Sequence, residues 1–325
     1  MRLQIKKVCM VIRADAPGDS EVGVGHVMRC IALAEAWIRT GGAKAVLLTA
    51  NCLPWVAKAA NDAGIDVAPM LMAPGEVWSE SDAKYLAEFA VGCNADWVVV
   101  DGYRFGVEYF KTLSSGGDFR VMAVDDYGHC SRYDVDIVLN ESGSSAFEKG
   151  PHTLVLQGFE YALVRREFYE ARLRRESHYS DERSVFVGMG GSNAMGLAEE
   201  ISDRLRNAGF VPFLADSTCS IARQMEHAGM GVVNGGMTAI EALGVGLPLI
   251  VVPVADNQIE PANFFRRMGA ARCVDPSCLD QIGQEAMNLS LYSAGMIRAG
   301  KSLIDCCGAG RVVSAMLLRA SCEAL

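Results

Sequence analysis

Short apolar runs rich in β-branched residues alternate with helix-like segments along the chain, and this alternation constrains the fold more than any other sequence feature. Runs without polar alternation indicate strands that are covered on both faces, as in parallel sheets. Between the runs, helical periodicity is clear in residues 27–39, where Ile31, Ala34 and Ile38 share one face. The sequence therefore predicts an α/β fold built from βαβ units. The expected strands are residues 8–13, 45–49, 97–101, 120–125, 136–139, 184–189, 211–214, 231–233 and 248–253.

The length of 325 residues predicts two domains, at about 150 residues each. Residues 167–183 are strongly charged, rich in arginine and poor in residues that could form a core strand. We therefore expect two Rossmann-like domains, spanning residues 1–170 and 184–325. Each half contains glycine-rich junctions where a strand leads into a helix, and paired α/β domains commonly bind their ligand in the cleft between such junctions.

Composition excludes several classes of protein. The net charge is −9 and no run of five or more Lys and Arg residues occurs, so we expect no nucleic-acid partner. An anionic ligand must then be held by local dipoles. No uninterrupted apolar stretch approaches the roughly 18 residues of a membrane span, and the run at residues 8–12 is shorter than a signal-peptide core. We expect a soluble cytoplasmic protein whose 11 cysteines are reduced, since none of them forms a CxxC pair.

The first glycine-rich junction is the segment GVGHVMR, in which Gly23, Gly25 and His26 lead into a helix after the first strand. The glycines let the backbone approach a ligand closely. At a helix N-terminus the dipole disfavours imidazolium, so we expect His26 to be a neutral ring that can accept a proton. A dinucleotide site is excluded, because Met28 replaces the third glycine and no acidic residue ends the second strand. Alternatively, His26 only caps or packs, and the glycines serve the turn.

Two further glycine-rich junctions follow strands in the second half of the chain. The amides of the later one, together with the dipole of the next helix, can hold a pyrophosphate without basic side chains. Glu241, one turn into that helix, can accept both hydroxyls of a ribose; alternatively it is a solvated acid favoured by the dipole. The earlier junction can equally be a tight turn with a helix cap. The residues concerned are Gly190, Gly191 and Ser192 in the earlier junction, Gly235, Gly236, Met237 and Thr238 in the later one, and Asn257 and Gln258 after the next strand, which can reach a sugar.

In order and spacing, the chain resembles one family over most of residues 8–270, in the segments RADA, GVGHVMRCIALAEAW, VVDGY, VDDYGH, YDVDIVLN, GFEYALVRREF, MGGSN and NGGMTAIEALGVGLPLIVVPVADNQ. The family is that of the pseudaminic-acid-pathway UDP-sugar hydrolases, the UDP-2,4-diacetamido-2,4,6-trideoxy-β-L-altropyranose hydrolases, which are relatives of the MurG-type glycosyltransferases. The resemblance implies the GT-B fold, in which two Rossmann-like domains with parallel sheets face each other across a cleft. It also implies that residues 1–170 hold the sugar and the catalytic residues, and that residues 184–325 bind UDP.

The resemblance further implies metal-independent, inverting hydrolysis of a UDP-activated 2,4-diacetamido-2,4,6-trideoxyhexose to free sugar and UDP, without a cofactor, in nonulosonic acid biosynthesis. It implies that His26 is the base that activates water, with Asp15 and Tyr103 near the sugar. The chain departs from the family in two places: Gly102 stands where the family has histidine, and residues 210–233 are short by a strand and a helix. The candidate substrate-binding residues are Arg13, Gly23, Gly25, Gly190, Gly191, Ser192, Gly235, Gly236, Met237, Thr238, Glu241, Asn257 and Gln258.

One base can be sufficient for such a reaction. Phosphate has a second pKa of about 6, so UDP leaves largely as an anion and needs charge stabilisation more than protonation. A glycosyltransferase on the same fold and an inactive UDP-sugar-binding module remain as alternatives. Asp134 and Asp136 match the DxD motif that holds a metal in some glycosyltransferases, but the motif opens an apolar strand and we expect no metal there.

Overall fold

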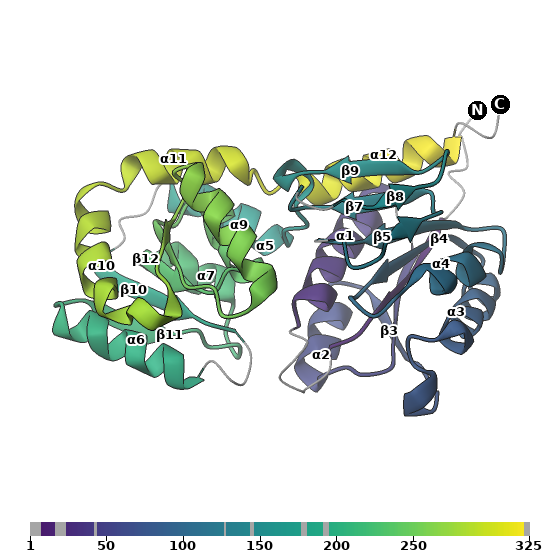
Figure 1. Cartoon of the computed structure of the whole chain (residues 1–325), viewed down its shortest axis with the longest axis horizontal. Helices are drawn as coiled ribbons and strands as arrows, with labels where there is room; N and C mark the ends of the chain where they lie inside the picture. The colour runs from purple at the N-terminus through teal and green to yellow at the C-terminus, as the bar shows by residue number, and fades with distance from the viewer. Residues whose placement is uncertain are drawn as a thin grey trace. The chain divides into compact units, whose positions relative to one another are not determined.

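The computed structural model describes residues 8–16, 24–41, 44–126, 128–143, 146–176, 181–190 and 195–321 (Figure 1). The chain divides into two compact units. Unit 1 consists of Met1–Leu163 and Gly308–Leu325, and unit 2 is the continuous segment Val164–Cys307. The chain therefore leaves unit 1 once, forms unit 2, and returns.

Unit 1 contains a seven-stranded sheet in the order β3-β2-β1-β4-β5-β7-β9, and every neighbouring pair is parallel. The strands are β1 (Cys9–Ala14), β2 (Lys44–Thr49), β3 (Asp66–Pro69), β4 (Ala95–Asp101), β5 (Arg120–Val124), β7 (Ile137–Asn140) and β9 (Leu154–Gln157). Strands β6 (Arg132–Tyr133) and β8 (Glu148–Lys149) form a separate small sheet. The helices are α1 (Gly25–Gly41), α2 (Pro54–Asp62), α3 (Glu80–Gly92), α4 (Val107–Ser114) and α12 (Gly308–Ser321), with short 3-10 turns η1 (Pro74–Glu76) and η2 (Phe159–Tyr161).

Successive residues of the central strand β1 enter different cores, because side chains alternate between the two faces of a strand. Met10 and Ile12 belong to the cluster that includes residues of α1, α2 and α12, whereas Val11 belongs to the cluster of α3 and α4. All three side chains are at most 1% exposed. A strand covered on both faces buries every residue, which explains the continuous apolar run in the sequence.

Unit 2 contains a five-stranded parallel sheet in the order β11-β10-β12-β13-β14. The strands are β10 (Asp181–Gly188), β11 (Val211–Leu214), β12 (Ala228–Val233), β13 (Leu249–Val251) and β14 (Arg272–Cys273). The helices are α5 (Arg166–Arg175), α6 (Met195–Asn207), α7 (Ile221–His227), α8 (Met237–Val245), α9 (Asp256–Arg267), α10 (Ile282–Leu291) and α11 (Ala294–Leu303), with a 3-10 segment η4 (Pro276–Gln281). Strand β11 is an edge strand of the sheet, and between β11 and β12 the chain forms only α7.

The predicted α/β class with two parallel sheets is confirmed. Each expected run forms a strand, β1, β2, β4, β5, β7 and β10 to β13, although several limits shift by a few residues. The prediction omitted β3, β9 and β14 of the two main sheets and the short strands β6 and β8. Strands β3 and β9 are the two edges of their sheet and are only partly buried, so they lack the continuous apolar run that marks the central strands.

The limits of the units differ from the expected domain limits at two helices. Helix α12 packs in the core of unit 1 through Val312 and Met316, although residues 184–325 were expected to form one domain. Helix α5 belongs to unit 2. Its Arg172 and Arg175 donate hydrogen bonds to main-chain carbonyl oxygens of unit 2, so the charged stretch is part of that unit's structure.

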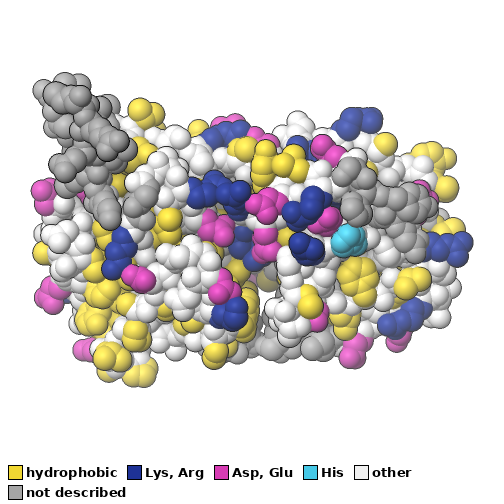
Figure 2. Space-filling view, turned by 180° about the vertical axis from the view of Figure 1, so that it is seen from behind, with side chains coloured by type: hydrophobic (Ala, Val, Ile, Leu, Met, Phe, Trp, Pro, Cys, Tyr) yellow, Lys and Arg dark blue, Asp and Glu magenta, His cyan; other side chains and the backbone are white. Residues whose placement is uncertain are grey.

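On the face of the molecule drawn in Figure 2, Lys and Arg side chains are intermingled with Asp and Glu side chains. Within the part of the chain that the structure describes, no helix combines the length and the apolar character needed to cross a bilayer.

Candidate functional site

His26 and Asp101 form a buried pair at the carboxyl edge of the sheet in unit 1. His26 is the second residue of α1, and Asp101 is the last residue of β4. Nδ1 of His26 lies 2.6 Å from Oδ1 of Asp101, and the side chains of His26 and Asp101 are 7% and 0% exposed. A carboxylate at this distance holds the proton on Nδ1, which leaves the lone pair of Nε2 available to accept a proton. The pair therefore has the geometry of a histidine base oriented by a carboxylate.

Arg29 surrounds this pair with further charge. Its Nε and Nη2 donate to the two oxygens of Asp101 at 2.6 Å each, and its Nη1 donates to Asp126 at 2.6 Å. Burial alone would raise the pKa of Asp101, but Arg29 and His26 outweigh it and hold that pKa well below its usual range. Glu141 lies 3.6 Å from Arg29, and burial raises the pKa of Glu141 to about 7. One guanidinium thus joins three acidic side chains beside His26.

Tyr103 completes the surroundings of the imidazole. Its ring meets His26 edge to face with 4.4 Å between the ring centroids, and its hydroxyl donates to Asp126 at 3.2 Å. The structure therefore brings together the predicted residues Tyr103 and His26. Gly102, the departure from the family pattern, has a φ of 153°, and a Cβ there would lie 2.9 Å from the ring of Phe105. This local geometry explains why the chain has glycine at that position.

A second histidine and carboxylate follow the next strand. His129 Nδ1 lies 2.9 Å from Asp125 Oδ1, and the hydroxyl of Tyr133 donates to the other oxygen of Asp125 at 2.8 Å. Burial alone would raise the pKa of Asp125. Interactions with His129, and then hydrogen bonds from Tyr133 and the amide of Gly128, lower that pKa to about 2. The rings of Tyr103 and His129 have centroids 5.8 Å apart. The His129 side chain is only 5% exposed, which favours a supporting role beside Tyr103.

The side chains of Arg13 and Asp15 are more deeply buried than expected for residues that contact a substrate. Arg13 is 0% exposed and pairs with Asp15 at 2.7 Å and with Asp82 at 2.9 Å. A fully buried guanidinium has no surface for a ligand, so the predicted substrate contact by Arg13 is corrected to a positioning role. Asp15, 7% exposed, accepts hydrogen bonds from the amides of Ala50 and Asn51, which hold the ends of β1 and β2 together.

In unit 2, the two glycine amides of the predicted pyrophosphate site already have partners. Gln258 Oε1 accepts from the amides of Gly235 and Val254 at 3.1 and 3.0 Å, and Asn234 Oδ1 accepts from Gly236 at 3.3 Å. A Cβ on Gly235 would lie 2.8 Å from the main-chain oxygen of Gln258. Glycine is therefore required at this position by the close approach of α9, whether or not its amide also meets a ligand.

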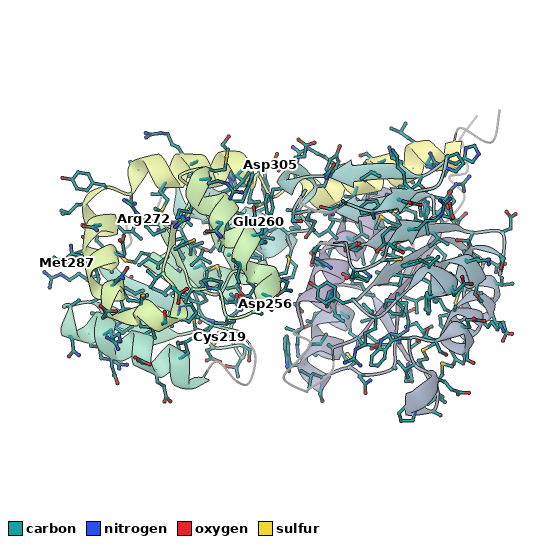
Figure 3. All side chains as sticks on the ribbon, viewed as in Figure 1. Cys219, Asp256, Glu260, Arg272, Met287 and Asp305 are labelled. Carbon is teal, nitrogen blue, oxygen red and sulfur yellow. The ribbon has the colours of Figure 1, made fainter. Side chains whose placement is uncertain are left out.

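Met237 and Thr238 are the first two residues of α8. Their main-chain amides therefore have no acceptor within the helix. Asn257 and Gln258 lie in the first turn of α9, which begins at Asp256 (Figure 3). Asn257 is exposed and Gln258 is half-buried. The two helix N-termini of α8 and α9 are thus joined through the Gln258 side chain.

Glu241 pairs with Arg165, a residue that the sequence did not single out. Arg165 donates from Nε and Nη2 to Glu241 Oε1 at 3.1 and 2.9 Å. Burial raises the pKa of Glu241, and Arg165 partly offsets that effect. Glu241 is 6% exposed, so it is not the solvated acid of the alternative interpretation. Arg165 and Glu241 are 76 positions apart, so only the three-dimensional structure reveals that they are partners.

The remaining predicted residues fall into two groups. Gly25 begins α1, and Gly190 has a φ of 66°, with its Cβ position 2.7 Å from Asn234 Nδ2. Gly23, Gly191 and Ser192 lie outside the described residues.

Structural contacts also account for the DxD motif. Asp134 pairs with Arg132 at 2.8 Å, and Asp136 accepts a hydrogen bond from the amide of Val121 at 2.9 Å. Across the described ranges, no group of three or more His, Cys, Asp and Glu side chains has the arrangement of a metal site.

A cavity of about 570 Å³ in unit 2 is lined by residues of α9 and of the segments before it and after β14. Its walls include Val254, Ile259, Asn263, Arg266 and Pro276. Among the described residues, its lining contains no predicted site residue, so the cavity does not coincide with the site built from α8 and the start of α9.

Comparison with known proteins gives distant relatives and a clear fold. No protein-family profile matches the chain. It is 24% identical over 213 residues to the UDP-2,4-diacetamido-2,4,6-trideoxy-β-L-altropyranose hydrolase of Campylobacter jejuni, covering 64% of this chain and 70% of the relative. It is 23% identical over 208 residues to the spore coat polysaccharide biosynthesis protein SpsG of Bacillus subtilis, covering 54% of this chain and 61% of that protein, less than two thirds of its length.

The crystal structure of MurG from Acinetobacter baumannii superimposes with a TM-score of 0.63 at 15% identity, covering 96% of this chain and 100% of MurG. The predicted GT-B-like fold is therefore confirmed.

Proposed function

We propose that the chain hydrolyses a nucleotide-activated sugar, releasing UDP and free sugar from a UDP-activated 2,4-diacetamido-2,4,6-trideoxyhexose with inversion. The observation that carries the proposal is the buried His26–Asp101 pair at the start of α1, on a GT-B fold. The distant similarity to the Campylobacter jejuni hydrolase supports the choice of sugar and of reaction. In this proposal the product sugar enters nonulosonic acid biosynthesis, and no metal or cofactor takes part.

In the proposed reaction, Nε2 of His26 removes a proton from water. The water oxygen attacks the anomeric carbon on the face opposite to UDP, and the bond from that carbon to the β-phosphate oxygen breaks with its electron pair leaving on UDP. Asp101 fixes the ring tautomer and stabilises the imidazolium that forms. General base catalysis of this kind contributes about 10²- to 10⁴-fold to a rate.

Unit 2 supplies the proposed nucleotide site. The amides of Met237 and Thr238 and the dipole of α8 would bind the diphosphate, and the amides of Gly235 and Gly236 would exchange the side-chain oxygens of Gln258 and Asn234 for phosphate oxygens. Glu241, oriented by Arg165, would accept the ribose hydroxyls. Asn257 and Gln258 would contact the sugar.

A glycosyltransferase is the second candidate, because the similar solved structures are glycosyltransferases. Such an enzyme needs an acceptor, whereas a hydrolase releases UDP with water alone. A binding module without turnover is the third candidate, and it predicts protection by UDP against thermal unfolding without release of UDP.

The test measures UDP release by the purified chain from a panel of UDP-sugars, with and without added acceptor sugars. His26→Asn should lower kcat by about 10²- to 10⁴-fold and leave the affinity for UDP-sugar nearly unchanged. His152→Asn is the matched control, because this exposed histidine lies in the same unit. Near-normal kcat in His26→Asn would remove His26 from the mechanism, and release that depends on an acceptor would establish the transferase.

A further inference from the structure

Three side chains of α1 converge on Asp101, the acid at the end of β4. His26, Arg29 and Cys30 stand at positions i, i+3 and i+4 of the helix, so their side chains share one face. At Oδ1 of Asp101, His26 Nδ1 and Arg29 Nη2 both lie 2.6 Å away. At Oδ2, Arg29 Nε lies 2.6 Å away and Cys30 Sγ lies 3.5 Å away. One face of α1 therefore supplies four donors to this carboxylate.

Arg29 has no surface left for a substrate. Its side chain is 3% exposed, and its remaining nitrogen, Nη1, donates to Asp126 at 2.6 Å and lies 3.6 Å from Glu141. The guanidinium is thus held by Asp101 along one edge and by these two acids at its other end. A side chain in this position can affect a reaction only through its neighbours.

The contact between Arg29 and Asp101 bears directly on the ring of His26. Two parallel hydrogen bonds from a guanidinium fix the plane of a carboxylate. An ionised carboxylate can only accept hydrogen bonds, so Nδ1 of His26 must carry the ring proton and Nε2 keeps its lone pair. Burial raises the pKa of Asp101, and the charge of Arg29 is the largest of the effects that lower it. Arg29 therefore does most to keep this acid an acceptor.

We infer that Arg29 is the positioning residue of the base: through Asp101 it keeps the ring proton of His26 on Nδ1 and leaves Nε2 unprotonated. The catalytic consequence rests on the proposed function. Without the guanidinium, Asp101 can bind a proton and donate it to Nδ1, which moves the ring proton to Nε2. Alternatively, His26 takes a second proton and pairs with the acids that Arg29 has left. In both cases Nε2 holds a proton and cannot accept one from water.

The first experiment detects the proton on Nε2 directly and needs no substrate. In a chain labelled with ¹⁵N at histidine, the chemical shift of each ring nitrogen shows whether it carries a proton. The signals of His26 are those that disappear in His26→Asn. At neutral pH we expect Nε2 to be unprotonated in the wild type and protonated in Arg29→Gln. Arg39→Gln, which removes an exposed arginine in the last turn of α1, should give the wild-type spectrum.

A second variant guards against misfolding of Arg29→Gln, which leaves two acids without their cation. Arg29→Gln combined with Asp126→Asn removes one acid together with the cation and keeps the contact between His26 and Asp101. Nε2 should be protonated in this double variant as well. Asp126→Asn alone should keep the wild-type spectrum at Nε2, because Arg29 still holds Asp101. Thermal denaturation establishes which variants are folded.

The third measurement is the rate of UDP release from the UDP-sugar. Arg29→Gln should lower kcat by about 10- to 100-fold, part of the contribution of a general base, and change KM by less than about twofold. Arg29→Lys restores the charge but not the planar fork, so it should recover part of kcat. In an Asp101→Asn background, Arg29→Gln should cause little further loss, and a double-mutant cycle measures this non-additivity.

The outcomes distinguish the role of Arg29 from the proposed function. If the wild type releases no UDP from any UDP-sugar, the proposed function fails, whereas the spectra still decide the role of Arg29. An unprotonated Nε2 in folded Arg29→Gln, or in the double variant with Asp126→Asn, overturns the positioning role and leaves Arg29 a residue that only stabilises the fold. A protonated Nε2 in the wild type at neutral pH overturns it as well.

Discussion

The candidate sites of the two units consist of different kinds of chemical groups. In unit 1, side-chain charges are buried and paired with one another, as in the group of His26, Asp101 and Arg29. In unit 2, the amides of Gly235 and Gly236, just before α8, are covered by the neutral side chains of Gln258 and Asn234, and one buried ion pair, Glu241 with Arg165, lies further along α8. Buried charges fix a geometry before any ligand arrives, whereas neutral amide contacts exchange at little cost. This difference agrees with the proposal that unit 1 carries the chemistry and unit 2 binds the nucleotide.

The largest expected effect comes from Asp101→Asn. An amide in place of the carboxylate can donate to Nδ1 of His26, so the ring proton moves to Nε2 and the base is lost. We expect kcat for UDP release to fall by about 10²- to 10⁴-fold with UDP affinity nearly unchanged. Asp134→Asn, on an exposed carboxylate, should retain full activity. A similar kcat in Asp101→Asn and the wild type would show that unit 1 is not arranged for base catalysis.

The next effect concerns stability. Replacing Arg29 by Met leaves Asp101, Asp126 and Glu141 close together without their shared cation. Breaking a buried ionic group in this way costs about 3–5 kcal/mol in the free energy of unfolding, which urea denaturation measures. Arg39→Met should change that free energy by less than about 0.5 kcal/mol. If Arg29→Met changes the free energy of unfolding by less than about 1 kcal/mol, the buried charges of unit 1 do not stabilise its site as described.

Glu141, one of the acids beside Arg29, should make the free energy of unfolding depend on pH. Its pKa rises to about 7 in the folded chain, mainly through burial, above the ordinary value of 4.5. The folded state thus favours the protonated acid, and this contribution to stability is complete below about pH 4.5 and is lost as pH rises through 7. Glu141→Gln should therefore gain roughly 1–3 kcal/mol relative to the wild type between pH 5 and pH 8.

Chemical denaturation of the wild type and of Glu141→Gln at pH 5 and at pH 8 tests this expectation. Glu148→Gln, on an exposed acid, serves as the control. A stability difference between Glu141→Gln and the wild type that stays constant with pH would contradict the assignment.

The smallest expected effect lies in unit 2. Gln258→Ala removes the acceptor that covers the amides of Gly235 and Val254, so UDP no longer has to displace it. We expect UDP affinity to rise about two- to tenfold, the range of one neutral hydrogen bond, while the additional affinity for the sugar moiety decreases. Calorimetry with UDP and a UDP-sugar measures both, and Gln284→Ala on α10 is the matched control. Weaker UDP binding would mean that Gln258 assists the nucleotide directly.

The sequence predicted the central strands and His26 because both depend on local patterns. Continuous apolar runs mark strands buried on two faces, and the GVGH segment marks a helix start. Asp101 was not predicted as the partner of His26, because their contact depends on β4 lying next to β1 in the sheet. The acid at the end of the VVVD run was the available signal, since the carboxyl ends of parallel strands share one edge.

The Glu241–Arg165 pair was missed for the same reason, since its members are 76 positions apart. Gly235 shows a different limit. Its spacing suggested a role in ligand approach, and its lack of a side chain also allows the close packing of α9; no local pattern distinguishes the two. Sequence patterns thus locate residues at strand ends more reliably than they identify the partners of those residues.

The return of α12 to unit 1 has a consequence for biosynthesis. A ribosome must translate all of Val164–Cys307 before Val312 and Met316 become available to cover the face of α1. Unit 2, being continuous, can finish folding while unit 1 still exposes part of its interior. The half of the protein that carries the proposed chemistry is therefore the last to mature, and during translation it depends on whatever shields that open surface.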